Sequence, residues 1–455
     1  MPVSITHYQN SHVNQSNFDW LNGTYKRRSL TCVKEDRISN LPEHLIDSIL
    51  ERLRIKDIVR TSIISKKWRY RWTKIKVLVL DEQFSITFAQ NGAFDRNGFI
   101  NTINHVLTSH NGPILKFHLH IPNMFLDSYQ EVDQWMLLLS RKSVRELVLI
   151  TTSNRRDELP SNVFSCLKLT KLDLKNCFIK QPLELERFIN LQTLFLLNID
   201  FGANFCETEI NLPKLKTLSL SNGTNVYSFN IKVTNLQMLF VYGCHDAMLL
   251  RLLHTPCLRL TDVSIVFMKP IQDFVRAERL TLATMLSNLP KVRSLVTDGH
   301  FLKFLSAEKN LNWLPHAVNG LHNLLLTDFE LGDLDQLHGA LYFLRNSPNL
   351  GNLGIVPWYM GPQVDAGPAL NHLESLNCLD YTLNELQTVM IVSLEGSRPE
   401  LLFIKLLLAH SPSLKKFTFR LNEVDVQNRL KIGEDLLQFP RASPKAELLY
   451  LNLEL

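Results

Sequence analysis

The sequence predicts a small helical module followed by a long α/β solenoid of irregular repeats. Two observations predict this fold class. Apolar residues between positions 41 and 75 recur at helical spacing, and from position 144 onward a short leucine motif recurs to the end of the chain. None of the 455 residues lies in a run that approaches the roughly 18 uncharged apolar residues of a membrane helix.

The helical module begins near Pro42, which suits the first turn of a helix because its missing N–H costs nothing there. The apolar residues after it form two adjacent stripes at helical spacing. One stripe is Leu45, Ile49 and Leu53, and the other is Ile46 and Leu50. Two stripes are more than the core of a small module can use. The surplus stripe therefore predicts a permanent protein partner that buries it.

A second helical stretch is expected from about Lys56 to Ile75, and it mixes cations with aromatic residues. Such a mixture can bind nucleic acid. Here, however, Ile64, Trp68 and Trp72 fall on one helical face, which is a packing pattern. The cations of the outer face are Lys66, Lys67, Arg69 and Arg71. We expect that face to meet solvent or an acidic protein rather than nucleic acid.

The positive charge of the chain is concentrated in this module. The whole chain carries a net charge of +5, whereas residues 34–76 hold twelve basic and six acidic residues, a net charge of +6. A partner of the module is therefore expected to be acidic. The total is too mild to indicate nucleic-acid binding by itself.

From Val144 onward one motif recurs: an apolar residue, two others, a leucine, one other and a second apolar residue. Copies begin at Val144, Leu169, Leu191, Leu215, Leu236, Leu260, Val292, Leu321, Leu350, Leu373 and Leu414, and the leucine-rich run from Leu448 closes the chain. This is the leucine-rich-repeat pattern, in which each L-x-L pair is a short strand and neighbouring repeats stack. The first six starts are 21 to 25 residues apart, and most later spacings are longer. The longer spacings predict inserted helices or loops.

Alternation along a strand turns the residue between the two leucines away from the core and toward the concave surface. These outward residues are Val148, Asp173, Phe195, Ser219, Phe240 and Ser264. Exposed aromatic residues are favoured at binding hot spots. We expect Phe195 and Phe240 to lie side by side on the concave sheet and to bind a target. A covering loop or C-terminal segment is the open alternative.

The sequence contains no recognisable catalytic motif. It has no Walker A loop, no G-x-S-x-G, no H-E-x-x-H and no G-x-G-x-x-G. His118 and His120 would share one side of a strand, but two ligands do not make a metal site, and a strand-surface role is favoured. None of the seven cysteines are spaced C-x-x-C, which argues against zinc and fits a reducing compartment. We expect no enzymatic activity, no cofactor and no metal.

The residues from Arg37 to Trp72 closely resemble an F-box. The family pattern I-S-x-L-P-x-x-L-x-x-x-I-L-x-x-L reads here from Ile38 to Leu53, and the blocks K-D-x-V-R-T-S and L-S-x-x-W-R-x-x-W follow it. Ile64 stands where the family often has Leu, and Ile55 where it usually has Pro. The resemblance implies docking on a Skp-type adaptor, which joins a cullin-RING ubiquitin ligase. The residues implied at that contact are Leu41, Pro42, Leu45, Ile49 and Leu53.

An F-box followed by leucine-rich repeats is similar to the plant F-box/LRR group. Residues 399–417 resemble the FBD region at the end of many such plant proteins. We expect a flexible leader at 1–35, the F-box at 36–80, the leucine-rich-repeat solenoid at 81–385, and an FBD-like region at 386–455 that continues the repeats.

The resemblance implies a non-enzymatic substrate-recognition subunit of an SCF-type ubiquitin ligase whose repeats bind a target protein. We expect it in the cytoplasm, the nucleus or both. The alternative is a scaffold that binds the adaptor and a partner without ubiquitination. An enzyme hidden in the repeats is a third class. The sequence does not name the target, and it leaves open whether a small molecule binds in the solenoid.

Overall fold

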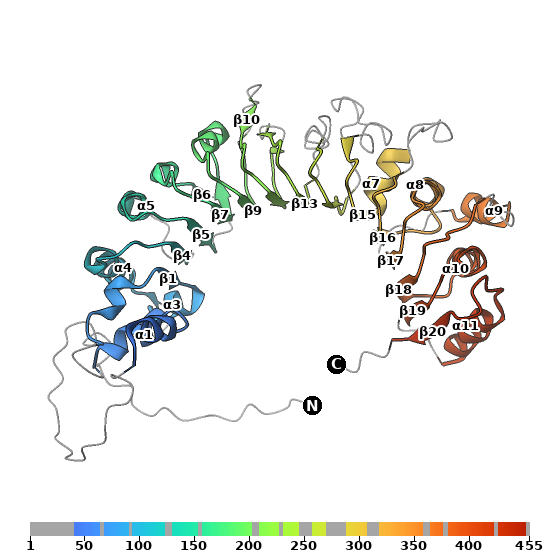
Figure 1. Ribbon diagram of the computed structural model, residues 1–455, viewed down its shortest axis with the longest axis horizontal. Coiled ribbons are helices and arrows are strands. Elements are labelled where there is room, and N and C mark those ends of the chain that lie inside the picture. Colours follow the sequence, from blue (N-terminus) through green and yellow to red (C-terminus); the bar gives the residue numbers. More distant parts are fainter. Residues whose placement is uncertain are drawn as a thin grey trace, which may run out of the picture.

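The computed structural model describes residues 41–63, 68–90, 93–122, 130–152, 157–202, 209–226, 231–244, 257–269, 288–306, 318–357, 365–375, 381–422 and 426–451. The leader expected at 1–35 and the expected helical residues 64–67 lie outside these ranges. Within them, the chain forms an arc whose inner side is lined by strands and whose outer side carries most of the helices (Figure 1). The fold class predicted from the sequence is confirmed.

One parallel sheet of fourteen strands runs the length of the arc, and its strand order follows the chain. Its strands are β1 (Val77–Leu80), β4 (Lys116–Ile121), β5 (Glu146–Thr151), β7 (Lys171–Lys175), β9 (Thr193–Leu197), β11 (Thr217–Ser221), β13 (Met238–Tyr242), β14 (Asp262–Val266), β15 (Ser294–Asp298), β16 (Asn323–Phe329), β17 (Asn352–Pro357), β18 (Thr388–Leu394), β19 (Lys416–Leu421) and β20 (Glu447–Tyr450). Two-residue strands form three small sheets: β2 (Ala89–Gln90) with β3 (Ala93–Phe94), β6 (Asp157–Glu158) with β8 (Cys177–Phe178), and β10 (Ile210–Asn211) with β12 (Ile231–Lys232).

The helices fall into an amino-terminal group and a group that joins the strands. The first are α1 (Glu43–Leu50), α2 (Ile55–Arg60) and the 3-10 turns η2 (Thr61–Ile63) and η3 (Arg71–Lys74). The second are α3 (Glu82–Ile86), α4 (Arg96–Ser109), α5 (Gln130–Arg141), η5 (Ser161–Ser165), η6 (Pro182–Arg187), α7 (Gly299–Ser306), α8 (Leu334–Asn346), α9 (Gly367–Ser375), α10 (Arg398–His410) and α11 (Val426–Gln438).

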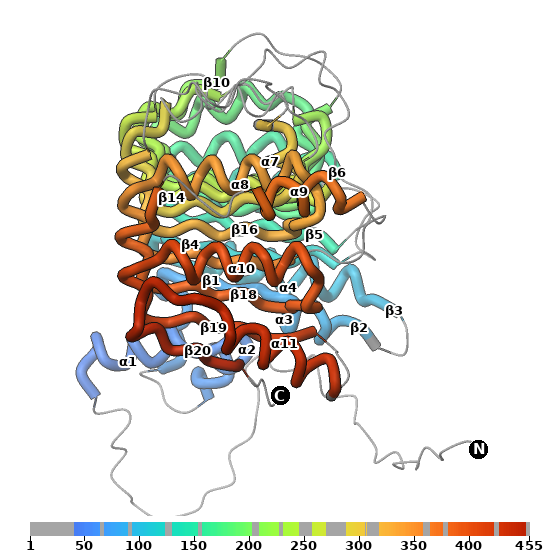
Figure 2. The backbone as a smooth tube through the Cα atoms, turned by 90° about the vertical axis from the view of Figure 1, so that its right-hand side faces the viewer, coloured from blue at the N-terminus to red at the C-terminus, as the bar shows by residue number. Residues whose placement is uncertain are grey.

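Repeat length decides what lies on the outer side. The 25- and 22-residue repeats that start at β5 and β7 return through the short turns η5 and η6, whereas the 29-residue repeats that start at β15 and β16 return through α7 and α8. A helix shortens the path per residue and so takes up the extra chain. Figure 2 shows the resulting coils stacked on one another. The longer spacings were expected to hold inserted helices or loops, and in the two 29-residue repeats they hold helices.

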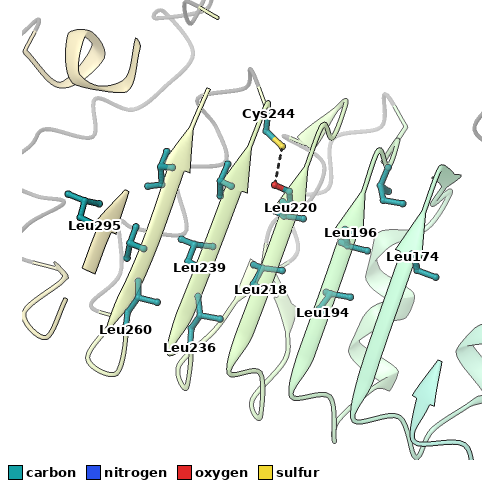
Figure 3. Close-up of a cluster of buried hydrophobic side chains, with 14 of the residues drawn as sticks. Leu174, Leu194, Leu196, Leu218, Leu220, Leu236, Leu239, Cys244, Leu260 and Leu295 are labelled. Carbon is teal, nitrogen blue, oxygen red and sulfur yellow. Dashed lines mark hydrogen bonds between the residues drawn. The ribbon is translucent and has the colours of Figure 1, made fainter. Parts of the chain in front are cut away.

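The core is a set of leucine ladders that run across the strands. Leu194, Leu218 and Leu239 occupy the same register position on β9, β11 and β13, and each is at most 1% exposed. Figure 3 shows these side chains in rows beneath the sheet, with the Cys244 thiol 3.8 Å from the carbonyl of Leu220. Because no single repeat can cover its own leucines, each depends on its neighbours.

Asparagines close several strands at the end opposite to their leading turn. Asn176, Asn198 and Asn222 all have positive φ, a conformation that Asn tolerates better than most residues. The side chain of Asn198 donates to Asn176 at 2.6 Å, and that of Asn176 donates to the carbonyl of Thr151. Gly243 takes the same place after β13, with φ of 63°. The asparagines that follow the motif thus form a ladder of their own.

One predicted repeat was wrong. Leu373 was expected to begin a copy of the motif, but it lies in α9, and the strand that pairs next to β17 is β18, which follows Leu386. The error has a physical cause. A spacing of three residues between leucines fits a helix face as well as the turn of a repeat, and only position within the stack separates them.

The continuous helix expected from Lys56 to Ile75 was also wrong. Helix α2 ends at Arg60, the turn η2 follows it, and η3 is separated from it by residues outside the described ranges. Trp68 and Trp72 are nevertheless buried, at 2% and 7% exposure, as their spacing predicted.

The amino-terminal helices and the sheet share one continuous core. It extends from Ile46 on α1 to Ala446 before β20. Strand β1, which lies inside the segment expected to be the F-box, pairs in parallel with β4 and is the first strand of the long sheet. Leu78 and Leu80 on this strand are fully buried. The helices can therefore be removed without disturbing the sheet only if β1 stays.

We predict different outcomes for two truncations. Removal of residues 1–74 keeps β1 and should leave a cooperatively unfolding solenoid without adaptor binding. Removal of residues 1–80 also deletes Leu78 and Leu80, each contributing about 1.5–3 kcal/mol of burial, and exposes β4 as a new edge. Circular dichroism during heating should show a clearly lower midpoint for the longer truncation. Equal midpoints would show that β1 is not part of the solenoid core, and an unfolded shorter truncation would contradict two separable modules.

Candidate docking surfaces

Helix α1 separates its two apolar stripes between the core and solvent. Ile46 and Leu50 are fully buried. Leu45 and Ile49 on α1 are 43% and 40% exposed, and Leu53, which was expected on the same helical stripe but lies in the turn after α1, is 39% exposed. We call these three residues the outer stripe. Exposed large aliphatic side chains grouped in this way are typical of interaction surfaces.

Leu41 and Pro42 precede this helix in different environments. Pro42 is exposed at the helix N-cap position, which leaves its ring accessible beside the outer stripe. Leu41 is half-buried and packs against the core. Leu41 therefore also supports the fold, and replacing it would affect folding as well as binding.

Two exposed apolar residues of the same module were missed from the sequence. Ile63 is 67% exposed and Tyr70 is 69% exposed. Ile63 follows the buried Val59 by four residues, but the change from α2 to a 3-10 turn alters the rotation per residue and turns Ile63 to solvent. No periodic pattern in the sequence marks either residue.

The basic outer face of the second helical stretch differs from the expectation. Arg71 has a side chain only 15% exposed and bridges to α1 through Asp47, at 3.1 Å, and through Glu43. It ties η3 to α1 instead of facing a partner. Arg69 is exposed, and Lys66 and Lys67 lie outside the described residues.

The concave face of the sheet carries the outward residues, and strand register shows how they are arranged. One row across the strands is Val79, His118, Val148, Asp173, Phe195, Ser219, Phe240 and Ser264. Ser219 on β11 thus separates Phe195 on β9 from Phe240 on β13. The expectation that the two phenylalanines lie side by side was wrong, because β9 and β13 are not adjacent strands. Val148 lies in the outward row as expected, but its side chain is only 8% exposed.

Strand β13 is the most exposed apolar element of this face. Met238, Phe240 and Tyr242 are 40%, 37% and 44% exposed. Sequence reasoning missed Met238 and Tyr242, although the same alternation predicts that residues two positions either side of Phe240 face outward. Phe195 is half-buried, with the Lys171 ammonium 5.3 Å from the centre of its ring. That distance allows a cation–π contact.

The two histidines on β4 form no metal site. His120 is 6% exposed, and its Nδ1 lies 2.8 Å from the Ser85 hydroxyl. Burial lowers the pKa of both His118 and His120, so both are neutral at physiological pH. In the part of the chain that the structure describes, no three His, Cys, Asp or Glu side chains are grouped so as to hold a metal ion.

The described cysteines are buried structural thiols. Burial raises the pKa of Cys166 and of Cys177 to about 12, so neither forms the thiolate that nucleophilic attack requires. Among the described residues, no helix is long and apolar enough to cross a membrane.

Comparison with known proteins identifies both parts of the chain. The profile of the F-box domain matches residues 38–80, and the profile described as "FBD-associated F-box protein At5g56370, LRR repeats" matches residues 132–355. Neither profile describes a catalytic family.

Curated relatives match over nearly the whole length. The Arabidopsis thaliana F-box/FBD/LRR-repeat protein At1g13570 is 33% identical over 418 residues, which are 92% of this chain and 99% of that protein. The Arabidopsis thaliana FBD-associated F-box protein At5g56370 is 25% identical over 91% of this chain and the whole of the relative. A solved Listeria monocytogenes internalin aligns over 78% of this chain and 95% of its own, at 14% identity and a TM-score of 0.29, too low to support an argument. The exposed F-box helix, the stacked leucine repeats and the full-length match to At1g13570 together place this chain in the plant F-box/FBD/LRR-repeat family.

Proposed function

We propose that this chain is a substrate-recognition subunit of an SCF-type cullin-RING ubiquitin ligase. Proteins that join an F-box to leucine-rich repeats generally act as such adaptors, and F-box domains generally bind Skp1-type proteins. The observation that carries the proposal for this chain is the outer stripe, which lies on α1 and the turn after it. Its three aliphatic side chains are left partly in water, although α1 already buries Ile46 and Leu50.

The outer stripe supports docking energetically. Full burial of a large aliphatic side chain is worth about 1.5–3 kcal/mol, and the stripe offers the uncovered part of three such side chains. Pro42 extends the same exposed surface at the start of the helix, and Leu41 joins it from the core side. We assign Leu41, Pro42, Leu45, Ile49 and Leu53 to the adaptor contact.

The concave face of the sheet supports the second part of the proposed function, the binding of a target protein. Phe240 lies on the exposed β13 row, and Phe195 lies two strands away. Aromatic side chains in partly exposed positions are favoured as binding hot spots. We assign Phe195 and Phe240 to the target contact.

Affinity purification of the tagged full-length chain with proteasome inhibition tests this function. Recovery of a Skp-type protein together with a cullin supports a ligase subunit. Recovery of the Skp-type protein without a cullin supports the alternative, a scaffold that binds its partner without ubiquitination. A purification that yields neither contradicts both.

Substitution of the two phenylalanines should separate binding from folding. We predict that Phe195→Ala and Phe240→Ala each weaken binding to the purified target by about 1–3 kcal/mol while leaving the unfolding midpoint nearly unchanged. The matched core variant Phe188→Ala, at a site of 0% exposure, should cost about 3–5 kcal/mol of stability. A similar loss of stability in Phe240→Ala would show that this ring is structural and that the target surface lies elsewhere.

A further inference from the structure

A row of cations borders the concave face along the edge where the strands begin. In each coil from β1 to β15, we consider the residues one and three positions before the strand. Nine of these positions hold Lys or Arg and none holds Asp or Glu: Lys74, Lys76, Arg145, Lys168, Lys214, Lys216, Arg259, Lys291 and Arg293. All nine are exposed. We call them the basic rim.

Backbone hydrogen bonds hold the rim in register. The amide of Lys216 donates to the carbonyl of Gln192, and the amide of Gln237 donates to the carbonyl of Lys216, both at 2.8 Å. The same ladder continues from Lys76 through Arg293. Equivalent positions of successive coils are therefore about 4.8 Å apart along the edge, the spacing of paired strands. The coils of β4, β9 and β13 hold no cation at these positions.

The charge of the rim is not neutralised within the described residues. None of the nine cations forms an ion pair there; Lys168 and Lys214 bond instead to the neutral side chains of Ser143 and Asn190. A single-sign row that lacks its own counter-charges favours an acidic partner and speeds its association.

One strand joins the rim to the aromatic part of the concave face. Lys214 and Lys216 lead into β11, whose outward residues are Thr217, Ser219 and Ser221. We call these three the hydroxyl strip. Among the described residues, none of their hydroxyl groups has a hydrogen-bond partner. At the same positions, the neighbouring strand β9 is preceded by the neutral residues Asn190 and Gln192, and β13 by Asn235 and Gln237.

Larger side chains stand on both sides of the hydroxyl strip. In register, Phe195 and Phe240 flank Ser219, and Leu197 and Tyr242 flank Ser221. The strands that carry them are two spacings, or about 10 Å, apart, which is room for one extended chain. The backbone of β11 is already paired on both sides, so an occupant would be held by side chains and not by an added strand.

We propose that the concave face binds an extended, acidic target segment laid along β11. Its acidic residues pair with Lys214 and Lys216, and a neighbouring apolar residue lies over Ser219 between Phe195 and Phe240. The hydroxyl strip supplies hydrogen bonds to the segment's backbone. This inference rests on the proposed role as a substrate receptor and adds the chemistry of the substrate.

Carboxylates on the same face favour a peptide over a nucleic acid. Asp173 is beside Phe195 in register, and Asp262 is beside Met238. A phosphate backbone carries a charge at every unit and would be repelled at both places, whereas a peptide can place neutral residues there.

Selection from a peptide library tests the proposal with the full-length chain. Phage-displayed random peptides of about 12 residues, which span about 40 Å when extended, would be panned against the wild-type protein. We expect the recovered peptides to share Asp or Glu next to an aromatic or large aliphatic residue. Recovery of no peptide, or of peptides without an acidic excess, would overturn the proposal.

Variants then locate the bound peptide. The double variant Lys214→Glu with Lys216→Glu should reduce the affinity for the recovered peptide by about tenfold or more, and the separate variant Ser219→Trp should do the same. The matched control is Lys415→Glu with Lys416→Glu, at the start of β19 far along the sheet, and it should leave affinity unchanged. If Ser219→Trp leaves the affinity for the peptide unchanged, the proposal is overturned. It is also overturned if single-stranded RNA displaces the peptide and loses affinity for the same variants in the same order.

The adaptor affinity of these variants separates this proposal from the proposed function. The hydroxyl strip lies on β11 and the outer stripe on α1 and the turn after it, so all of these substitutions should leave binding of a purified Skp-type adaptor unchanged. Failure of peptide selection with intact adaptor binding would remove only the acidic-segment proposal.

Discussion

Ile49→Asp is expected to reduce the affinity of this protein for a Skp-type adaptor by at least about a hundredfold. Ile49 lies in the centre of the outer stripe and is 40% exposed in the free chain. A carboxylate carried into an apolar contact without a partner costs several kcal/mol, and each 1.4 kcal/mol is about tenfold in affinity. Isothermal titration calorimetry with purified adaptor would measure the change. The fold should persist, because Ile46 and Leu50, the residues by which α1 packs into the core, are unchanged and stay buried.

Leu430→Asp is the matched control for this variant. Leu430 is also a large aliphatic residue exposed on a helix, at 63%, but it lies on α11 at the opposite end of the arc (Figure 1). The Leu430→Asp variant should bind the adaptor with the same affinity as the wild-type protein. Wild-type affinity in Ile49→Asp, or equal loss in both variants, would remove the outer stripe from the adaptor contact.

Leu218→Ala is expected to destabilise the solenoid by about 2–5 kcal/mol. Leu218 is fully buried on β11, and its neighbours in the ladder, Leu194 and Leu239, cannot close the gap without moving their own strands. Chemical denaturation followed by circular dichroism should show a midpoint at lower denaturant concentration. Repeat arrays need not unfold in one step, so the comparison is between midpoints.

Ser219→Ala, one residue further along the same strand, should change stability by no more than about 0.5 kcal/mol. Its side chain points to the concave face, away from the ladder. Similar losses in the two variants would contradict the assignment of inward and outward faces on β11, and with it the placement of the hydroxyl strip.

The repeat architecture was predictable because each strand carries its own local signal. The leucine spacing of Leu215, Leu218 and Leu220 marks a strand and its preceding turn without reference to any other repeat. Where the same spacing also fits a helix, as at Leu373, local sequence could not decide. The correct strand, β18, carries Val389 and Ile391 and is preceded by Leu386, a less regular series in which the central leucine is replaced by valine.

The division of α1 into buried and exposed stripes was predictable in kind, since two stripes exceeded one core. Which stripe faces inward depends on how the helix packs into the shared core, which no spacing encodes. The role of Arg71 was likewise hidden, because its partners Glu43 and Asp47 are distant in sequence.

The arrangement of Phe195 and Phe240 depended on strand order. Each was correctly placed on the outward face from its own repeat, but the serine strand between them appears only when the repeats are set in register. The basic rim also becomes visible only when the repeats are set in register. Its cations are scattered along more than two hundred residues and gather only because the coils stack.

We propose above all that the amino-terminal helices dock on an SCF adaptor. Titration of the purified full-length wild-type chain with a purified plant Skp-type adaptor tests it most directly. We predict a one-to-one complex with an affinity in the micromolar range or tighter, about −8 kcal/mol or more favourable. The absence of measurable binding by the folded wild-type protein would contradict the account.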